Sequence, residues 1–168
     1  MPRRPGAGRG ARLLLAAALA AAAGACRARP PGRLERALAA QVKRRITVGG
    51  RGDANPLPAT PELVARGREA FSHYCVACHG LDGQNTGVPF AEAMSPPVPR
   101  LSSSEVQAYA DGQLRWIVEN GLYPSGMPAS RGILNDEEMW SIVLWLRHLP
   151  PAGSLGEPAV YAGAEAGR

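Results

Sequence analysis

The chain has 168 residues, three cysteines and a formal net charge of +5, enough length for one domain with flanking segments. The positive charge is concentrated near the start, because residues 1–25 contain four arginines and no acids, and residues 26–60 contain eight basic residues against two acids. Residues 61–150 contain six arginines against ten acids. The expected folded domain is therefore acidic, which excludes nucleic acid as its partner.

The first 25 residues have the pattern of a signal peptide. Basic residues are followed by an uninterrupted apolar run from Leu13 to Ala23. This run is too short to cross a bilayer as a relaxed helix and lacks the polar periodicity of a packed helix. We therefore predict export of the chain to the periplasm.

The leader ends in small residues followed by Cys26, which resembles the cleavage box of a bacterial lipoprotein. Cleavage after Ala25 would also fit, but lipidation of Cys26 accounts for a cysteine that otherwise has no role. Residues 26–60 are rich in Arg, Pro and Gly, and we interpret them as a partly disordered, membrane-proximal linker. Its basic run at residues 43–45 either contacts anionic lipid headgroups or is simply solvated.

The domain is expected to span residues 61–150 and to begin with an amphipathic helix capped by Thr60. This helix leads into Cys75-Val76-Ala77-Cys78-His79, the spacing of a covalent c-type haem attachment site. In such a site each cysteine forms a thioether with the haem, and the histidine binds the iron. A thioredoxin-type redox pair would require a preceding strand, and a zinc site would require a second pair of ligands; neither pattern is present.

The rest of the domain contains no period-two alternation, so we predict an all-α fold of three to five helices around one haem. A long loop rich in Gly and Pro follows His79, as expected for a segment that wraps a large group. Helices are predicted near residues 102–109, from residue 111 to residue 121, and from a cap at Asn135 to Pro150. Residues 151–168 are predicted to be a disordered tail.

Residues 61–150 resemble a class I mono-haem cytochrome c domain, similar to the cytochrome c subunits of bacterial haem–copper oxidases. The resemblance rests on Gly67 and Phe71 before the haem motif, and on Ser125-Gly126-Met127-Pro128 before a Trp-rich last helix. It implies that the first and last helices cross where Gly67 and Phe71 meet Trp145. An acidic residue is usual in the family at the position of Arg100, where this chain therefore departs from the pattern.

The resemblance implies that Met127 is the sixth ligand of the iron, opposite His79. Met94 is the other methionine candidate, whereas Met139 belongs to a helical stripe and is expected in the core. Bis-histidine ligation through His73 or His148 is the less favoured alternative. The resemblance also suggests that the Pro89 carbonyl accepts a hydrogen bond from His79, and that Trp116 or Arg100 contacts the haem propionates.

The sequence thus predicts an electron-transfer protein with haem c bound through Cys75, Cys78, His79 and Met127, and no enzyme activity of its own. Its expected redox partners are a terminal oxidase, a quinol-oxidising complex or a dehydrogenase. The alternatives are a haem c subunit of a larger oxidase or dehydrogenase complex, or a haem enzyme or gas sensor with a labile sixth ligand.

Overall fold

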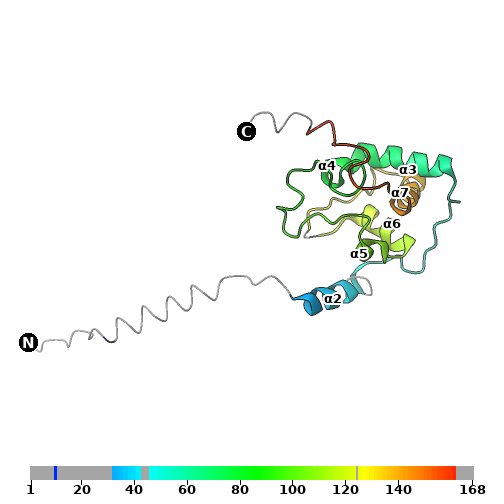
Figure 1. The fold of residues 1–168 in the computed structure, drawn as a ribbon. Helices are drawn as coiled ribbons and strands as arrows, with labels where there is room; N and C mark the ends of the chain where they lie inside the picture. The colour runs from blue at the N-terminus through cyan, green and yellow to red at the C-terminus, as the bar shows by residue number, and fades with distance from the viewer. Residues whose placement is uncertain (1–9, 11–31, 43–45, 124, 162–168) are drawn as a thin grey trace, which may run out of the picture. The chain divides into compact units, whose positions relative to one another are not determined.

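The structure is a computed structural model that describes residues 10, 32–42, 46–123 and 125–161 (Figure 1). The predicted signal peptide, except for Gly10, and the lipidation site Cys26 lie outside the described residues. Within the described ranges the fold is helical without strands, as predicted, and no helix there is long and apolar enough to cross a membrane. The helices are α2 (Arg33–Val42), α3 (Pro61–Tyr74), α4 (Val76–His79), α5 (Ser104–Gln107), α6 (Asp111–Asn120) and α7 (Asp136–Arg147).

The chain divides into two compact units, of which the first ends at Ala39 within α2. The second unit begins at Ala40 and contains α3 to α7, and therefore all the motifs that carry chemistry.

The haem motif is positioned by α3, which crosses α7 at a glycine (Figure 1). The helix begins as the sequence predicts, with Thr60 Oγ1 accepting the Leu63 N–H at 3.3 Å and Pro61 in the first turn. A β-carbon placed on Gly67 would lie 1.9 Å from the Ser141 carbonyl oxygen. Only glycine allows the two backbones to approach so closely, so the predicted crossing of the first and last helices is confirmed.

The last helix, α7, forms the centre of the core. Asn135 caps it by accepting the Glu138 N–H at 2.9 Å, and Glu138 Oε2 accepts the Asn135 N–H in return. Ile142 and Val143 are 1% and 0% exposed, so this helix is buried on nearly every side. The buried cluster around it draws on α3, α6 and α7 and consists of Ala70, Phe71, Leu101, Leu114, Val118, Leu134, Met139, Trp140, Ile142, Val143, Trp145 and Leu146.

The packed unit extends upstream of the expected boundary at residue 61. Val48 is buried, and the Gly112 N–H donates to the Asp53 carbonyl at 3.1 Å. The Asn55 side chain donates to the Trp140 carbonyl of α7 at 3.0 Å. Residues 46–60 therefore lie on α6 and α7, although their composition resembles a linker.

The described part of the predicted tail also has a defined path, and we call residues 150–161 the C-terminal strap. The strap returns to the segment after the haem motif, where Asp82 Oδ2 accepts the Gly153 N–H at 2.7 Å. The Tyr161 hydroxyl donates to the Ala77 carbonyl at 2.7 Å, and Pro158 is almost fully buried. The expected boundary after residue 150 thus falls inside the packed unit, and the rest of the tail lies outside the described residues.

Candidate haem-attachment site

The haem motif forms one tight turn at the end of α3. The Cys75 N–H donates to the Phe71 carbonyl at 2.9 Å, so the chain leaves α3 without a break. The N–H groups of Cys78 and His79 both donate to the Cys75 carbonyl, at 3.1 and 3.0 Å. This turn brings two thiols and one imidazole together on a short rigid segment, with both thiols free.

The electrostatics of the motif differ from those of a redox dithiol. Burial, followed by the neighbouring Cys78, raises the pKa of the Cys75 thiol to about 12. Thioredoxin-type pairs depend on a cysteine with a lowered pKa, whereas the pKa of Cys75, the first cysteine of this motif, is raised. Burial also lowers the pKa of His79 to about 4, which keeps its imidazole neutral at physiological pH. Neutral imidazole is the form that binds a metal.

His79 is oriented by the protein around it. Its ring lies 6.4 Å from that of Phe71, between centroids. The nearby backbone of Pro99 raises the pKa of His79 and so partly offsets the effect of burial. The buried Nδ1 atom of His79 nevertheless has no hydrogen-bond partner of ordinary geometry. Pro89, whose carbonyl the resemblance suggested as the acceptor for the His79 ring, is exposed, and the proline whose backbone acts on the His79 ring is Pro99. The proline-rich sequence contained several candidates, and only the path of the loop distinguishes them.

Met127 lies in a tight turn directly after α6. The Leu122 N–H donates to the Met127 carbonyl at 3.1 Å, while the Ser125 N–H and hydroxyl both donate to the Leu122 carbonyl. Gly121 has a φ of +68°, and a β-carbon there would lie 2.4 Å from the Met127 carbonyl oxygen. The backbone of Met127 is therefore seated on the end of α6, and its side chain is half-buried.

Of the other methionines, Met139 is in the core, as predicted, with 5% exposure. Met94 is half-buried, and its Cε atom lies 3.5 Å from the position that a β-carbon of Gly126 would take. The two candidate ligands of the iron thus belong to neighbouring loops, and Met94 stands beside the turn that carries Met127.

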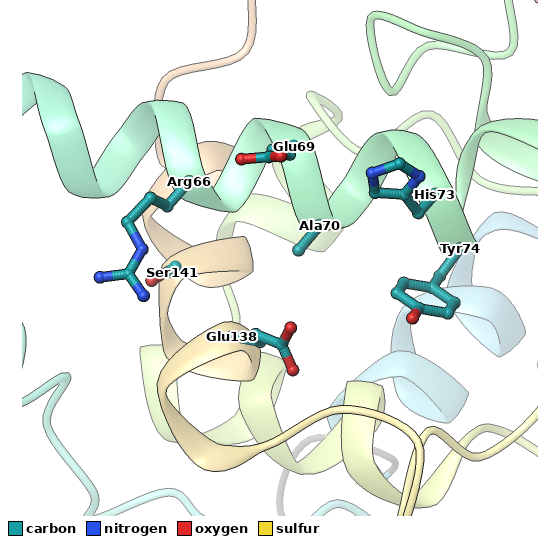
Figure 2. A pocket seen from close by; sticks show the side chains of 7 residues that line it. All are labelled: Arg66, Glu69, Ala70, His73, Tyr74, Glu138 and Ser141. Atoms are coloured by element: carbon teal, nitrogen blue, oxygen red, sulfur yellow. The ribbon is translucent and has the colours of Figure 1, made fainter.

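The two alternative histidines lie elsewhere on the surface. His73 is exposed and lines a surface cleft of about 320 Å³ between α3 and α7, where Figure 2 shows it with Tyr74 on the α3 side. The lining is mostly polar and charged and consists of Arg66, Glu69, Ala70, His73, Tyr74, Glu138 and Ser141. His148 is exposed at the end of α7, where its Nδ1 atom lies 2.8 Å from the Leu144 carbonyl oxygen. His73 thus belongs to α3, two residues before Cys75, and His148 directly follows α7.

The two residues proposed to contact propionates have different surroundings. Trp116 is half-buried and packs closely against Gly49, since a β-carbon there would lie 2.7 Å from its Nε1 atom. Arg100 is exposed, directly after Pro99. The structure thus shows Trp116 packed against the backbone of the upstream segment and leaves Arg100 at the surface.

The donor set suits a covalently held haem: two free thiols, a neutral, half-buried imidazole with a buried and unpaired Nδ1 atom, and a thioether on a turn whose backbone is hydrogen-bonded. The model of the family described as cytochrome c oxidase, cbb3-type, subunit III matches residues 62–146, just over half of the chain. The chain belongs to this cytochrome c family. As a class I c-type cytochrome it carries covalently attached haem c, and it is an electron-transfer protein. A search of curated proteins found no significant match.

The family match ends at residue 146 and begins at residue 62. The upstream segment on α6 and α7 and the C-terminal strap therefore lie outside the matched region, although both pack on it.

Proposed function

We propose that this cytochrome is a periplasmic, membrane-tethered carrier of single electrons, with one haem c attached to Cys75 and Cys78 and its iron bound by His79 and Met127. The observation that carries the proposal is the seating of the Met127 backbone on the end of α6, which gives a residue with a thioether side chain a defined place in a protein whose haem motif would supply the other ligand. When bound, the haem supplies a one-electron Fe(III)/Fe(II) couple.

The residues of the chain have defined tasks in this proposal. His79 would bind the iron through Nε2, which leaves its buried Nδ1 atom on the protein side of the ring. Met127 would supply the second side-chain ligand of the iron, exclude water and exogenous ligands, and favour the reduced state. With His79 and Met127 both bound, the iron would have no site for a substrate, and the group would serve to exchange electrons with a docked partner.

Carbon monoxide binding to the reduced protein tests this closed coordination. A carrier with both ligands in place should not bind carbon monoxide appreciably at neutral pH, and a spectroelectrochemical titration should fit a single one-electron step. Rapid formation of a carbon monoxide complex by the wild-type protein would instead support a haem enzyme or gas sensor with a labile sixth ligand.

The family name supports a second candidate, in which the chain is a haem c subunit of a terminal oxidase or another larger complex. A carrier would alternate between a quinol-oxidising complex or dehydrogenase and an oxidase, whereas a subunit would stay with one of them. Purification in mild detergent from the native membrane distinguishes the two, because a subunit elutes with stoichiometric partner chains and a carrier elutes without them.

The membrane tether is proposed from the sequence, since small residues precede Cys26 and a basic segment follows it. Cys26→Ser should move the mature protein from the membrane to the soluble periplasmic fraction, with the leader removed. Retention in the membrane with an intact leader by mass would replace the lipid with an uncleaved anchor.

A further inference from the structure

The loop between α6 and α7 carries Met127 and is attached to α6 a second time, beyond the turn already described. The Ser130 N–H donates to the Val118 carbonyl and the Arg131 N–H to the Glu119 carbonyl, both at 3.1 Å. Carbonyls in the last turn of a helix lack partners within the helix, so this return of the chain satisfies them. Met127 is therefore held between two attachment points on the same helix end.

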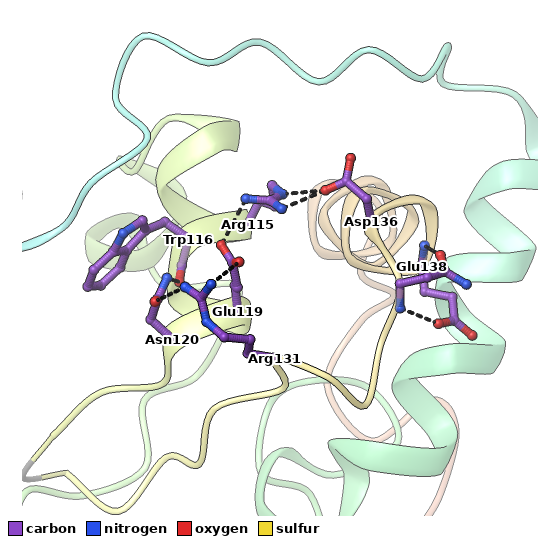
Figure 3. A network of polar contacts seen from close by, with 8 residues as sticks. Arg115, Trp116, Glu119, Asn120, Arg131, Asp136 and Glu138 are labelled. Carbon is purple, nitrogen blue, oxygen red and sulfur yellow. Dashed lines mark hydrogen bonds and ion pairs between the residues drawn. The ribbon is translucent and has the colours of Figure 1, made fainter.

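The second attachment point is reinforced by side chains that converge on Glu119 (Figure 3). Its Oε1 atom lies 3.2 Å from Arg131 Nη1, and its Oε2 atom lies 3.0 Å from Arg115 Nη1. Arg131 also donates to Asn120 Oδ1 at 2.7 Å. One carboxylate thus joins the Met127 loop to two successive turns of α6.

The same network reaches α7 through Arg115. Two of its nitrogens donate to Asp136 Oδ1, at 2.9 and 2.6 Å, and its guanidinium lies 5.7 Å from the ring centre of Trp140. The side chains of Glu119 and Arg115 are only 17% and 22% exposed, so their attraction is less screened by water than that of an ordinary surface pair. The network fixes the loop between α6 and α7 relative to both helices.

We propose that Glu119 is a positioning residue for the sixth iron ligand: it holds Met127 in place by clamping the far end of its loop to α6 through Arg131 and to α7 through Arg115. The inference rests on the proposed function, in which Met127 binds the iron. Loss of the Glu119 charge leaves two guanidinium groups close together without their shared partner. The loop then opens more often without unfolding of the helices, because local opening depends on the local contacts alone.

The chain offers a matched control in the ion pair between Arg66 of α3 and Glu137 of α7, at 2.6 Å. These side chains are 59% and 49% exposed, and their ion pair joins α3 to α7 rather than the Met127 loop to α6. Glu119→Gln and Glu137→Gln are the same substitution, and each removes one negative charge with almost no change in side-chain volume. A difference between the two variants therefore reports the position of the charge rather than the net charge of the protein.

The test uses the haem-loaded protein and two spectroscopic readouts of methionine release. These are the rate of carbon monoxide binding to the reduced protein and the pH at which the sulfur-to-iron charge-transfer band of the oxidised protein disappears. We expect carbon monoxide to bind Glu119→Gln about tenfold faster than the wild type, the effect of losing one hydrogen-bonded charge contact. The band should disappear at a lower pH. Glu137→Gln should match the wild type in both the rate of carbon monoxide binding and the pH at which the band disappears. Arg131→Gln should give values between those of the wild type and Glu119→Gln.

Equal behaviour of Glu119→Gln and Glu137→Gln overturns the inference. The inference is also overturned if the thermal unfolding midpoint of Glu119→Gln falls far enough to account fully for the faster carbon monoxide binding. Glu119 would then stabilise the fold as a whole rather than the Met127 loop. Arg131→Gln removes only the loop side of the network and keeps the test valid if Glu119→Gln does not fold. Met127→Ala separates the two proposals: if the band survives in it, the ligand assignment fails, and if the band is lost there while Glu119→Gln behaves as the control, only the positioning role fails.

Discussion

Replacement of Gly67 by alanine should destabilise the domain, although alanine is intrinsically the better helix former. In an exposed helix the substitution would stabilise by about 1 kcal/mol. Here the new β-carbon would lie 1.9 Å from the Ser141 carbonyl oxygen and 2.4 Å from its carbonyl carbon. Ordinary contact requires about 3.5 Å, so α3 and α7 would have to separate by roughly 1.5 Å. Overpacking typically costs about 1–3 kcal/mol, and a clash between two backbones belongs at the upper end, where it exceeds the helix-propensity gain by about 2 kcal/mol.

A net loss of about 2 kcal/mol corresponds to a fall of about 10 °C in the midpoint of thermal unfolding for a domain of this size. Circular dichroism at a helix wavelength, on the haem-loaded protein, measures it. Gly52→Ala is the control, because a β-carbon at Gly52 meets nothing within 4 Å, and its midpoint should stay close to that of the wild type. The atoms that Gly67 meets are backbone, so no side-chain movement relieves the clash. A midpoint for Gly67→Ala at or above that of Gly52→Ala would refute the close crossing of the two helices.

Two further predictions concern the haem motif and the strap. Replacing both Cys75 and Cys78 by alanine should leave a chain without a cooperative thermal transition. The reason is that a domain of about 100 residues with long loops depends on the haem for its core. A sharp, native-like thermal transition in this variant would contradict the prediction. Burial raises the pKa of Asp82, but hydrogen bonds from Thr86, Gly153 and Gln84 outweigh it and leave the pKa below its usual 3.8. Asp82→Asn should therefore lower the free energy of unfolding by about 2 kcal/mol at neutral pH. Urea unfolding should show that the difference in this free energy between variant and wild type shrinks as the pH falls below about 4, where Asp82 becomes protonated. A difference that stays constant with pH would argue against the ionised contact.

The helices and their ends were predictable because their signals are local. Thr60 and Asn135 cap their helices as expected, and the apolar spacing identified the buried faces of α3 and α7. The glycine in the first helix was recognised as a point of close approach, since it occupies a buried position at a cost. The cysteine spacing identified the attachment site without any tertiary information.

The packed flanks were not predictable from the sequence, because their contacts are distant along the chain. Asn55 reaches Trp140, 85 residues away, and Tyr161 reaches Ala77, 84 residues away. Neither flank has a helical or strand period, so composition alone suggested a linker and a tail. The influence of Pro99 on His79 was missed for a related reason, since its backbone acts on the ring only once the loop has folded.

The most direct test of the central claim compares the oxidised spectra of two methionine variants. Met127 and Met94 stand in adjacent loops, and only one thioether can occupy the position opposite His79. We predict that Met127→Ala loses the weak sulfur-to-iron charge-transfer band, binds carbon monoxide when reduced and has a lower reduction potential, whereas Met94→Ala keeps the wild-type band and stays closed. Loss of the band in Met94→Ala together with its persistence in Met127→Ala would contradict the account.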